Sequence, residues 1–324
     1  MSERYGRQSI LPEIGPGGQA RLDAAHVLVV GAGGLGCAVL PYLAAAGVGR
    51  LSIVDHDRVE ESNLHRQPLY RMSDLGAPKA RAARAALTGL NPGVKVDAHV
   101  ARLTPGNAST LVTGADLVVD AADSFAVTYI LNDACQTAGR VLVSASVLGW
   151  SGYVGVFCGG GPSYRAVFPE LPRRAGSCAE SGVLGTAVGV MGTLQAHLVL
   201  AVLLDLAPTV RGRLLSLDFR TLHVGTVSFQ GAAEPEEQPL PFIDAAEVTA
   251  DDVVVDLRSL AEAPVSPFAA ALRVDVEAVE GARVCLPRER RAVLCCRSGL
   301  RAWRAARALQ AAGYERLALV ALNE

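Results

Sequence analysis

The stretch 27–37 constrains the fold more than any other part of this sequence, because it joins a short apolar run to a glycine-rich turn. The run Val-Leu-Val-Val has the composition of a buried parallel strand. An apolar, alanine-rich helix is expected directly afterwards, over 38–47, and Asp55 ends the next apolar run. Strand, tight turn, helix, strand and acid, in this order, are the nucleotide-binding fingerprint. The turn carries the G-x-G-x-x-G spacing at Gly31, Gly33 and Gly36.

A turn of this kind binds a nucleotide through its backbone. Glycines let the chain approach a phosphate closely, and the helix that follows offers free N–H groups and the positive end of its dipole. The Asp55 carboxylate can accept hydrogen bonds from a ribose. The motif leaves the nucleotide open. NAD is its usual ligand, so an NAD-dependent oxidoreductase is one candidate, and a glycine turn that serves packing alone is the structural alternative.

Length and composition narrow the class of protein. The chain has 324 residues, which suggests two domains, and a net charge of −2, which gives no sign of a nucleic-acid-binding surface. Its seven cysteines form no C-x-x-C pair, so neither a disulfide framework nor a cysteine-rich zinc site is expected. No signal peptide is recognisable, and Gln195 and His197 interrupt the longest apolar run, 182–206. We therefore expect a cytoplasmic protein with a buried helix in this run and no membrane span.

Apolar runs alternate with helical patterns through the first half of the chain. This alternation predicts an α/β fold with a Rossmann-like, doubly wound parallel sheet. Ligands of such sheets lie at the carboxyl ends of the strands, where the glycine turn, Asp55 and Asp123 fall. Strands are expected over 51–54, 94–100, 117–120 and 141–144, and helices over 19–25, 76–90 and 125–138.

The pattern changes after residue 151. Further strands surround the long apolar helix, and a Pro/Gly/Ser loop carries Cys178. The segment 231–241 is polar and proline-rich, which is typical of a linker that lets a second domain move. We expect a first domain over 1–230 and a small α/β domain over 242–324. The expected elements are strands at 153–157, 214–218, 224–229, 253–257 and 291–296, a loop at 169–182 and a helix at 301–312.

Three charged residues favour a triphosphate over a dinucleotide. Arg66 and Lys79 supply fixed positive charge, and Asp123 offers a carboxylate that could hold Mg²⁺ against phosphate oxygens. The alternative is that Arg66 and Lys79 are solvated surface charges and that Asp123 is a helix N-cap. Because all three are expected near the carboxyl edge of one sheet, together they favour ATP.

Several motifs of the first 125 residues occur together and carry a resemblance. They are Arg4-Tyr-x-Arg7-Gln8, Gly31-Ala-Gly-Gly-Leu-Gly36, Asp55-x-Asp57, Ser62-Asn-Leu-x-Arg66-Gln67, Lys79 and Asp120-x-x-Asp123. With them the sequence resembles the MoeB/ThiF family, the ubiquitin-activating-like adenylyltransferases, over about residues 1–230. The family adenylates the C-terminal glycine of a small ubiquitin-like sulfur carrier protein that ends in Gly-Gly, and it releases pyrophosphate. The resemblance implies ATP and Mg²⁺ as cofactors, the carrier as partner, and a homodimer.

The resemblance also implies roles at the matching positions. Asp55 would hold the ribose, Lys79 and the segment 62–66 would line the phosphates, and Asp123 would bind Mg²⁺. Ser124 stands where the family usually has Asn, which alters that contact. Arg7 matches an arginine that reaches into the neighbouring subunit's site in the family's dimers. The nucleotide-binding set implied is Gly31, Gly33, Gly34, Gly36, Asp55, Asp57, Ser62, Asn63, Leu64, His65, Arg66, Gln67, Lys79, Asp123 and Ser124.

The sequence departs from the family at its structural zinc site, which usually uses two C-x-x-C pairs. The first pair should fall at 163 and 166, where the sequence reads Ser163-Tyr-Arg-Ala166, and the second should follow Phe229, where it reads Gln-Gly-Ala-Ala-Glu-Pro. Serine and alanine supply no thiolate. We therefore expect no zinc.

Cys178 matches the crossover-loop cysteine that forms a covalent link in sulfur-transferring members of the family. The alternative is an exposed cysteine without a role. Together the resemblance and the charge pattern predict five catalytic residues in the first domain: Arg7, Arg66, Lys79, Asp123 and Cys178.

The C-terminal segment resembles a rhodanese domain. It has Asp256-Leu-Arg258 after a strand and Cys296-Arg-Ser-Gly-Leu-Arg301 between a strand and a helix. Backbone N–H groups at a helix N-terminus stabilise a thiolate and a persulfide. Cys295 with Arg301 also fits the C-x5-R spacing of cysteine phosphatases. Cys296 fits the sulfurtransferase form, so the rhodanese resemblance implies Cys296 as the sixth catalytic residue. The domain is short and lacks the family's usual Gly-Gly-x-x-x-Trp tail, so an inactive rhodanese domain is an alternative.

The resulting prediction is an enzyme that adenylates a sulfur carrier and then passes sulfur to it to form a thiocarboxylate. The sulfur donor would be a cysteine desulfurase or thiosulfate. A scaffold that only binds carrier proteins is a further alternative. The carrier and its pathway stay open: molybdopterin, thiamine, tRNA thiolation, cysteine and secondary-metabolite synthesis all use such carriers.

Overall fold

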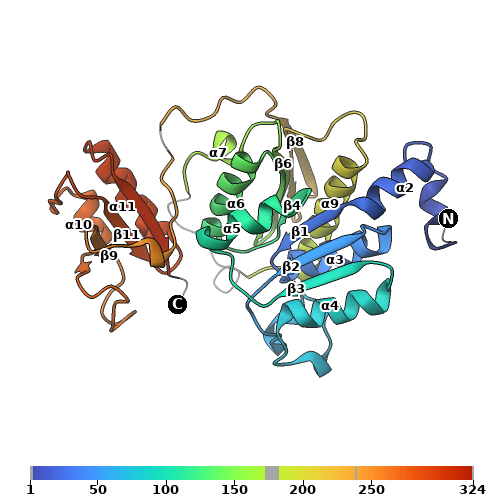
Figure 1. Cartoon of the computed structure of the whole chain (residues 1–324), viewed down its shortest axis with the longest axis horizontal. Helices are drawn as coiled ribbons and strands as arrows, with labels where there is room; N and C mark the ends of the chain where they lie inside the picture. Colours follow the sequence, from blue (N-terminus) through green and yellow to red (C-terminus); the bar gives the residue numbers. More distant parts are fainter. Residues whose placement is uncertain (1–2, 172–181, 238, 323–324) are drawn as a thin grey trace.

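The computed structural model describes residues 3–171, 182–237 and 239–322, and it contains two α/β units, each around its own sheet (Figure 1). The first sheet has eight strands in the order β3-β2-β1-β4-β5-β6-β7-β8. The strands are β1 His26–Val30, β2 Arg50–Val54, β3 Lys95–His99, β4 Leu117–Asp120, β5 Val141–Leu148, β6 Ser151–Cys158, β7 Arg213–Asp218 and β8 His223–Ser228. The helices of this unit are α1 Gly6–Ser9, α2 Gly15–Ala24, α3 Gly34–Ala46, α4 Lys79–Leu90, α5 Pro105–Thr113, α6 Phe125–Ala138, α7 Tyr164–Val167 and α9 Gly185–Leu203.

The parallel half of this sheet confirms the predicted Rossmann-like fold. Strands β1 to β5 pair in parallel, whereas β6, β7 and β8 continue the sheet with antiparallel pairs. All four residues of β4 are buried, as expected for a strand that helices cover on both faces. Val30 and Asp120 pair at the carboxyl ends of β1 and β4, so the loops after these two strands begin side by side.

Two differences from the sequence prediction have local causes. The helix expected from residue 38 begins at Gly34, directly from the glycine turn, because Gly33 already serves as its N-cap. Helix α5 was not predicted, although its start carries a signal. Thr104 and Asn107 form a reciprocal capping box, and Pro105 occupies the first helical position.

Helix α9 is the long apolar helix expected over 182–206. Among the described residues it is the one helix long and apolar enough to cross a membrane by length and composition. It packs against α3, where a Cβ on Gly192 would lie 2.7 Å from the Cβ of Ala38, so this glycine permits the close approach. Its Gln195 side chain is fully buried and donates to the carbonyls of Asp120 and Val143, at 2.6 and 3.0 Å.

The C-terminal unit has a four-stranded parallel sheet in the order β10-β9-β11-β12. Figure 1 places it at the opposite end of the molecule from the N-terminal helices. One cluster of buried apolar side chains runs through both units and includes Tyr129 of α6 and Trp303 of α11. The elements are β9 Val253–Asp256, β10 Leu272–Arg273, α10 Val276–Glu280, β11 Ala292–Cys296, α11 Leu300–Ala311 and β12 Leu317–Ala321.

The segment 231–241, expected as a polar linker, is anchored at several points. Leu240 is buried and its carbonyl accepts from the Arg165 guanidinium at 3.3 Å. The Glu234 carboxylate accepts two hydrogen bonds from Ser163. Directly after the segment, Phe242 is buried beside Leu319 of the second sheet. The connecting segment therefore packs on the first unit at Glu234 and Leu240 and reaches the second sheet at Phe242. It passes between two units whose buried side chains form one cluster.

Candidate adenylation and sulfur-transfer site

The glycine turn forms the floor of the site between β1 and α3. Gly31 has a φ of +97°, and a Cβ there would lie 2.5 Å from the carbonyl oxygen of Ala121. Only glycine fits such a backbone conformation at so close an approach. Helix α3 begins three residues later, so its free N–H groups face the same edge as the end of β4. The turn therefore has the form of a phosphate-binding loop.

The segment 62–67 lies over this turn. A Cβ on Gly34 would lie 2.6 Å from Val188 and 3.5 Å from the carbonyl oxygen of Arg66, and a Cβ on Gly185 would clash with the carbonyl of His65. Two glycines, one on α3 and one on α9, thus let the Arg66 segment come close. The Arg66 guanidinium is half-buried and contacts the His65 ring nitrogen at 2.8 Å.

Asp55, which directly follows β2, is hydrogen-bonded to the backbone of the glycine turn. Its buried carboxylate accepts from the backbone N–H of Ala32 and of Asp57, each at 2.7 Å. A carboxylate with two oxygens has lone pairs left after two such bonds, so it can still accept from a ribose hydroxyl. The structure therefore brings the predicted acid to the predicted turn.

Lys79, the first residue of α4, is 95% buried, and its Nζ lies 2.9 Å from the Asp57 carboxylate. Burial alone would raise the pKa of Asp57, but the hydrogen bond and charge of Lys79 lower it below its ordinary value. Tyr70 donates its hydroxyl to the carbonyl of Ala32 at 2.6 Å and lies 3.3 Å from the carbonyl of Lys79. Lys79 is therefore a fixed buried charge and not a solvated surface lysine.

Two acids in different environments lie at the carboxyl end of β4 and in the loop that follows it. Asp123 is exposed, whereas Asp120 is buried and accepts from the hydroxyls of Thr128 and Ser144 at 2.7 and 2.8 Å. Burial raises the pKa of Asp120 to about 6, although these hydrogen bonds oppose the shift. The N-cap of α6 is Ser124, not Asp123. An exposed carboxylate beside a phosphate-binding turn fits a magnesium ligand.

Three residues of this site have roles that the sequence did not reveal. Tyr70 joins the glycine turn to α4, Gln195 holds the ends of β4 and β5, and Asp120 orders the loop that presents Asp123. Asp120 stood in a recognised motif without a role. The other two had no local signal, because each acts on carbonyls far away in the chain.

A second group of functional side chains lies in the C-terminal unit, at the turn between β11 and α11. The fully buried Cys296 sulfur accepts from the N–H of Ala302 at 3.4 Å and interacts with the Arg301 side chain. Cys295 is the preceding strand residue and therefore faces the other side of the sheet. Burial raises its pKa to about 12. The turn at the N-terminus of α11 thus surrounds Cys296 and not Cys295, and Arg301 also donates to the carbonyl of Leu257 at 2.9 Å.

The geometry of a glycine turn, a buried lysine and an exposed aspartate in the loop after β4 coincides with a family match. The ThiF family model matches residues 5–238. The chain belongs to the ThiF family. ThiF-type adenylyltransferases use ATP, and this chain is an enzyme of that type. The family match ends before the C-terminal sheet.

Relatives agree with the ThiF assignment, and a solved structure agrees with the fold. The chain is 49% identical over 224 residues to a sulfur carrier protein adenylyltransferase of Thermus thermophilus, covering 67% of this chain and 83% of that protein. It is 51% identical over 218 residues to the adenylyltransferase and sulfurtransferase MOCS3 of Bos taurus, covering 66% of this chain and 48% of the relative. The aligned part thus spans about half of that relative. The crystal structure of E. coli MccB with ATP is similar in fold, with a TM-score of 0.62, 20% identity, and coverage of 71% of this chain and 72% of that chain.

In this ThiF-family chain Arg7 lies far from the glycine turn of its own chain. Gln8, its neighbour in α1, donates to the carbonyl of Ala46 at 2.8 Å, at the C-terminal end of α3. The glycine turn is at the opposite end of this helix of 13 residues. At 1.5 Å per residue the two ends are about 20 Å apart. Arg7 is exposed, and the structure does not bring it to the other predicted residues of its own chain.

Ser163 and Ala166, which stand at the positions of the family's first zinc-binding pair, take part in a hydrogen-bond network instead. Ser163 is buried, and Glu234 accepts from its N–H and hydroxyl at 2.7 and 2.5 Å. The Ser163 hydroxyl oxygen in turn accepts from the N–H of Ala166 at 3.2 Å. These groups include no thiolate and do not fit a four-cysteine zinc site. The expected absence of zinc stays a prediction. Cys178, predicted on the neighbouring loop, lies outside the described residues.

Proposed function

We propose that this protein adenylates the C-terminal glycine of a small ubiquitin-like sulfur carrier that ends in Gly-Gly and then transfers sulfur to it. One observation carries the proposal. The turn at Gly31, the Arg66 segment, Lys79 and Asp123 meet at one sheet edge of a ThiF-family chain. A relative that is 49% identical is named a sulfur carrier protein adenylyltransferase, and one that is 51% identical is named an adenylyltransferase and sulfurtransferase, which supports this substrate class and this pair of reactions.

The first step needs positioning and charge, not a protein nucleophile. A carboxylate oxygen of the carrier attacks the α-phosphorus of ATP, the bond to the β-phosphate oxygen breaks, and pyrophosphate leaves with the electron pair. Arg66 and Lys79 stabilise the negative charge that develops on the phosphates. Asp123 would hold the Mg²⁺ that neutralises the leaving group. The fixed N–H groups at the start of α3 orient the nucleotide without moving.

The second step would use the two cysteines. A donor, either thiosulfate or the persulfide of a cysteine desulfurase, loads Cys296 with sulfane sulfur. The terminal sulfur attacks the acyl carbon of the carrier adenylate, and AMP leaves with the electron pair of the C–O bond. The Cys178 thiolate then attacks the Cys296 sulfur of the acyl disulfide and releases the carrier thiocarboxylate. A dithiol reductant must reduce the Cys178–Cys296 disulfide that remains.

We further propose a cytoplasmic homodimer in which Arg7 completes the site of the partner subunit. The distance between α1 and the glycine turn of the same chain supports an arrangement in trans. The rhodanese resemblance at Cys296 supports an active C-terminal domain, because Ala302 and Arg301 already surround the sulfur.

Carrier-dependent exchange of radioactive pyrophosphate into ATP tests the proposal. We expect exchange with a Gly-Gly-ended carrier, and no exchange with the same carrier after removal of its last glycine. Asp123→Ala should abolish exchange, and Asp116→Ala, a substitution on a loop outside the site, should not. A protein that exchanges no pyrophosphate but transfers hydride to NAD would contradict the proposal. A scaffold would bind the carrier without ATP turnover.

A further inference from the structure

The two units meet at a cluster of aromatic rings around Trp303 of α11. The Trp303 ring is 4% exposed, and its centroid lies 5.3 Å from that of Tyr129 of α6. The Arg165 guanidinium lies over both rings, 4.6 Å from the Tyr129 centroid and 5.6 Å from the Trp303 centroid. The Trp303 indole N–H also donates to Glu170 at 3.3 Å. A buried tryptophan under a guanidinium is the typical anchor of a protein interface.

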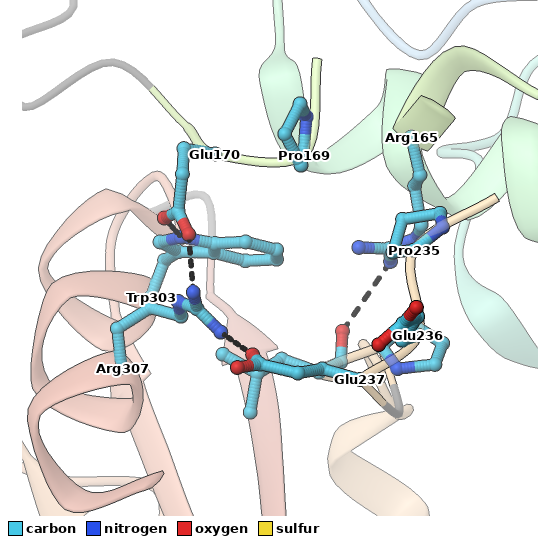
Figure 2. A pocket seen from close by; sticks show the side chains of 10 residues that line it. Arg165, Pro169, Glu170, Pro235, Glu236, Glu237, Trp303 and Arg307 are labelled. Atoms are coloured by element: carbon cyan, nitrogen blue, oxygen red, sulfur yellow. Dashed lines mark hydrogen bonds and ion pairs between the residues drawn. The ribbon is translucent and has the colours of Figure 1, made fainter. Parts of the chain in front are cut away.

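Charged side chains surround this anchor on its exposed side. Arg307, one turn further along α11, forms ion pairs of 2.5 Å with both Glu170 and Glu237. Figure 2 shows how the three side chains converge from three segments of the chain: the stretch after α7, the connecting segment and α11. The two glutamates are more than half exposed, so these pairs add little stability. Charges at an interface rim instead determine the relative orientation of the two surfaces.

The anchor orients the turn that holds the sulfur site. The backbone N–H of Trp303 donates to the carbonyl of Gly299 at 2.8 Å, so Trp303 lies in the first turn of α11, which begins directly after the Cys296 turn. A Cβ on Gly299, whose φ is +85°, would lie 3.5 Å from Ala126 and 2.7 Å from Phe242. Ala126 belongs to the first turn of α6, three residues after Asp123. The sulfur turn therefore lies against the element that begins at the magnesium-binding loop.

We propose that Trp303 and Arg307 are positioning residues that dock the C-terminal unit with the Cys296 turn against the adenylation site of the same chain. Sulfur then passes within one chain. This inference rests on the proposed function, because it assumes that Cys296 supplies the sulfur. It goes beyond that function by assigning the interface a role in transfer and by naming the residues that set it. Neither residue contacts a substrate; each acts through the orientation of the turn.

Three measurements on the full-length protein test the role of Trp303. They are pyrophosphate exchange, sulfur transfer from thiosulfate to cyanide, and single-turnover transfer from preloaded Cys296 to the carrier adenylate. In Trp303→Ala we expect the first two to stay within about twofold of wild type and the third to fall at least about tenfold, as a loss of positioning predicts. Small-angle scattering should show a larger radius of gyration. Trp303→Phe, which keeps a ring, and Trp150→Ala, at an exposed tryptophan, serve as controls.

Charge exchange provides an independent test that does not depend on a core substitution. Arg307→Glu places a third carboxylate beside Glu170 and Glu237 and should slow only the transfer step. Combination with Glu170→Arg restores an ion pair and should recover most of the rate. A mixed dimer of Cys296→Ala and Asp123→Ala subunits should transfer no sulfur, because neither chain holds both sites.

The proposal is overturned if Trp303→Ala transfers sulfur at the wild-type rate or faster. It is also overturned if the mixed dimer transfers sulfur, or if all three activities fall together, as a purely structural role predicts. Failure of the proposed function looks different. Wild-type protein would then show no carrier-dependent exchange, while the scattering change in Trp303→Ala would persist.

Discussion

The Glu234 carboxylate accepts hydrogen bonds from both the backbone N–H and the hydroxyl of Ser163. These two residues are 71 positions apart and lie where the wider family places its two pairs of zinc-binding cysteines. The contact joins the connecting segment to the start of α7. The Ser163–Glu234 contact therefore links the same two segments that four cysteines would link through a metal ion.

Ser163→Ala should weaken this link. The substitution removes one charge-assisted hydrogen bond and leaves the backbone N–H bond, so we expect the free energy of unfolding to fall by about 1–2 kcal/mol. Urea denaturation followed by fluorescence measures this change. Ser109→Ala, at an exposed helical position, should leave the midpoint unchanged. Equal midpoints for wild type and Ser163→Ala would show that the bond adds no stability.

Purified protein should contain zinc far below one ion per chain. The described residues near Ser163 and Ala166 offer a hydroxyl, a carboxylate and backbone groups, and these are weak ligands for zinc compared with thiolates. Elemental analysis by mass spectrometry measures the content, and a chelator should not change the melting temperature. One zinc per chain that survives dialysis would contradict this prediction.

Arg7→Ala and Asp123→Ala chains should each be inactive alone but partly active when mixed and refolded together. A mixed dimer then has one site with an intact Asp123 and an intact Arg7 from the partner. Random pairing makes half of the dimers mixed, so pyrophosphate exchange should recover to about a quarter of wild type. Asp123→Ala mixed with itself is the matched control. Exchange that stays at the control level would place Arg7 outside the shared site.

Asp120 should make stability decrease as the pH rises. Its pKa is about 6 in the folded chain against an ordinary value of 3.8, so between these values the folded state binds the proton more tightly than the unfolded state. Folding stability therefore falls as the pH rises through this window, by up to about 3 kcal/mol once pH 7 is reached. Asp120→Asn removes this dependence. The urea midpoints of wild type and Asp120→Asn, measured from pH 4 to pH 7, should therefore differ in their pH dependence. If the midpoints of both proteins change in parallel with pH, the raised pKa of Asp120 is disproved.

Substitution of the adjacent cysteines should separate their roles. Cys296→Ala should keep pyrophosphate exchange and lose sulfur transfer from thiosulfate, because the turn at the start of α11 surrounds that sulfur. Cys295→Ala should keep both activities, since burial holds the pKa of Cys295 near 12 and leaves almost no thiolate at neutral pH. The reverse pattern would favour the phosphatase-like spacing of Cys295 and Arg301.

Much of the adenylation half follows from the sequence, because its information is local. The glycine spacing at 31–36 and the strand-end acids at 55 and 123 lie on elements whose order requires a parallel sheet. The carboxyl ends of such strands meet at one edge, so residues far apart in the chain are predicted to meet there. Motif spacing likewise identified the turn at Cys296. The capping box at Thr104 shows that even a missed helix carried its own local signal.

Contacts between elements were decided only by the tertiary structure. The sequence does not reveal that Lys79 is buried against Asp57, or that Arg7 lies near the C-terminal end of α3, away from the glycine turn. Nor does it reveal that Trp303 packs on Tyr129 under Arg165. Local spacing and propensity specify which surfaces a helix or strand offers. Which surfaces then pack together depends on the shape and charge of side chains distant in the chain, and only the folded core brings these together.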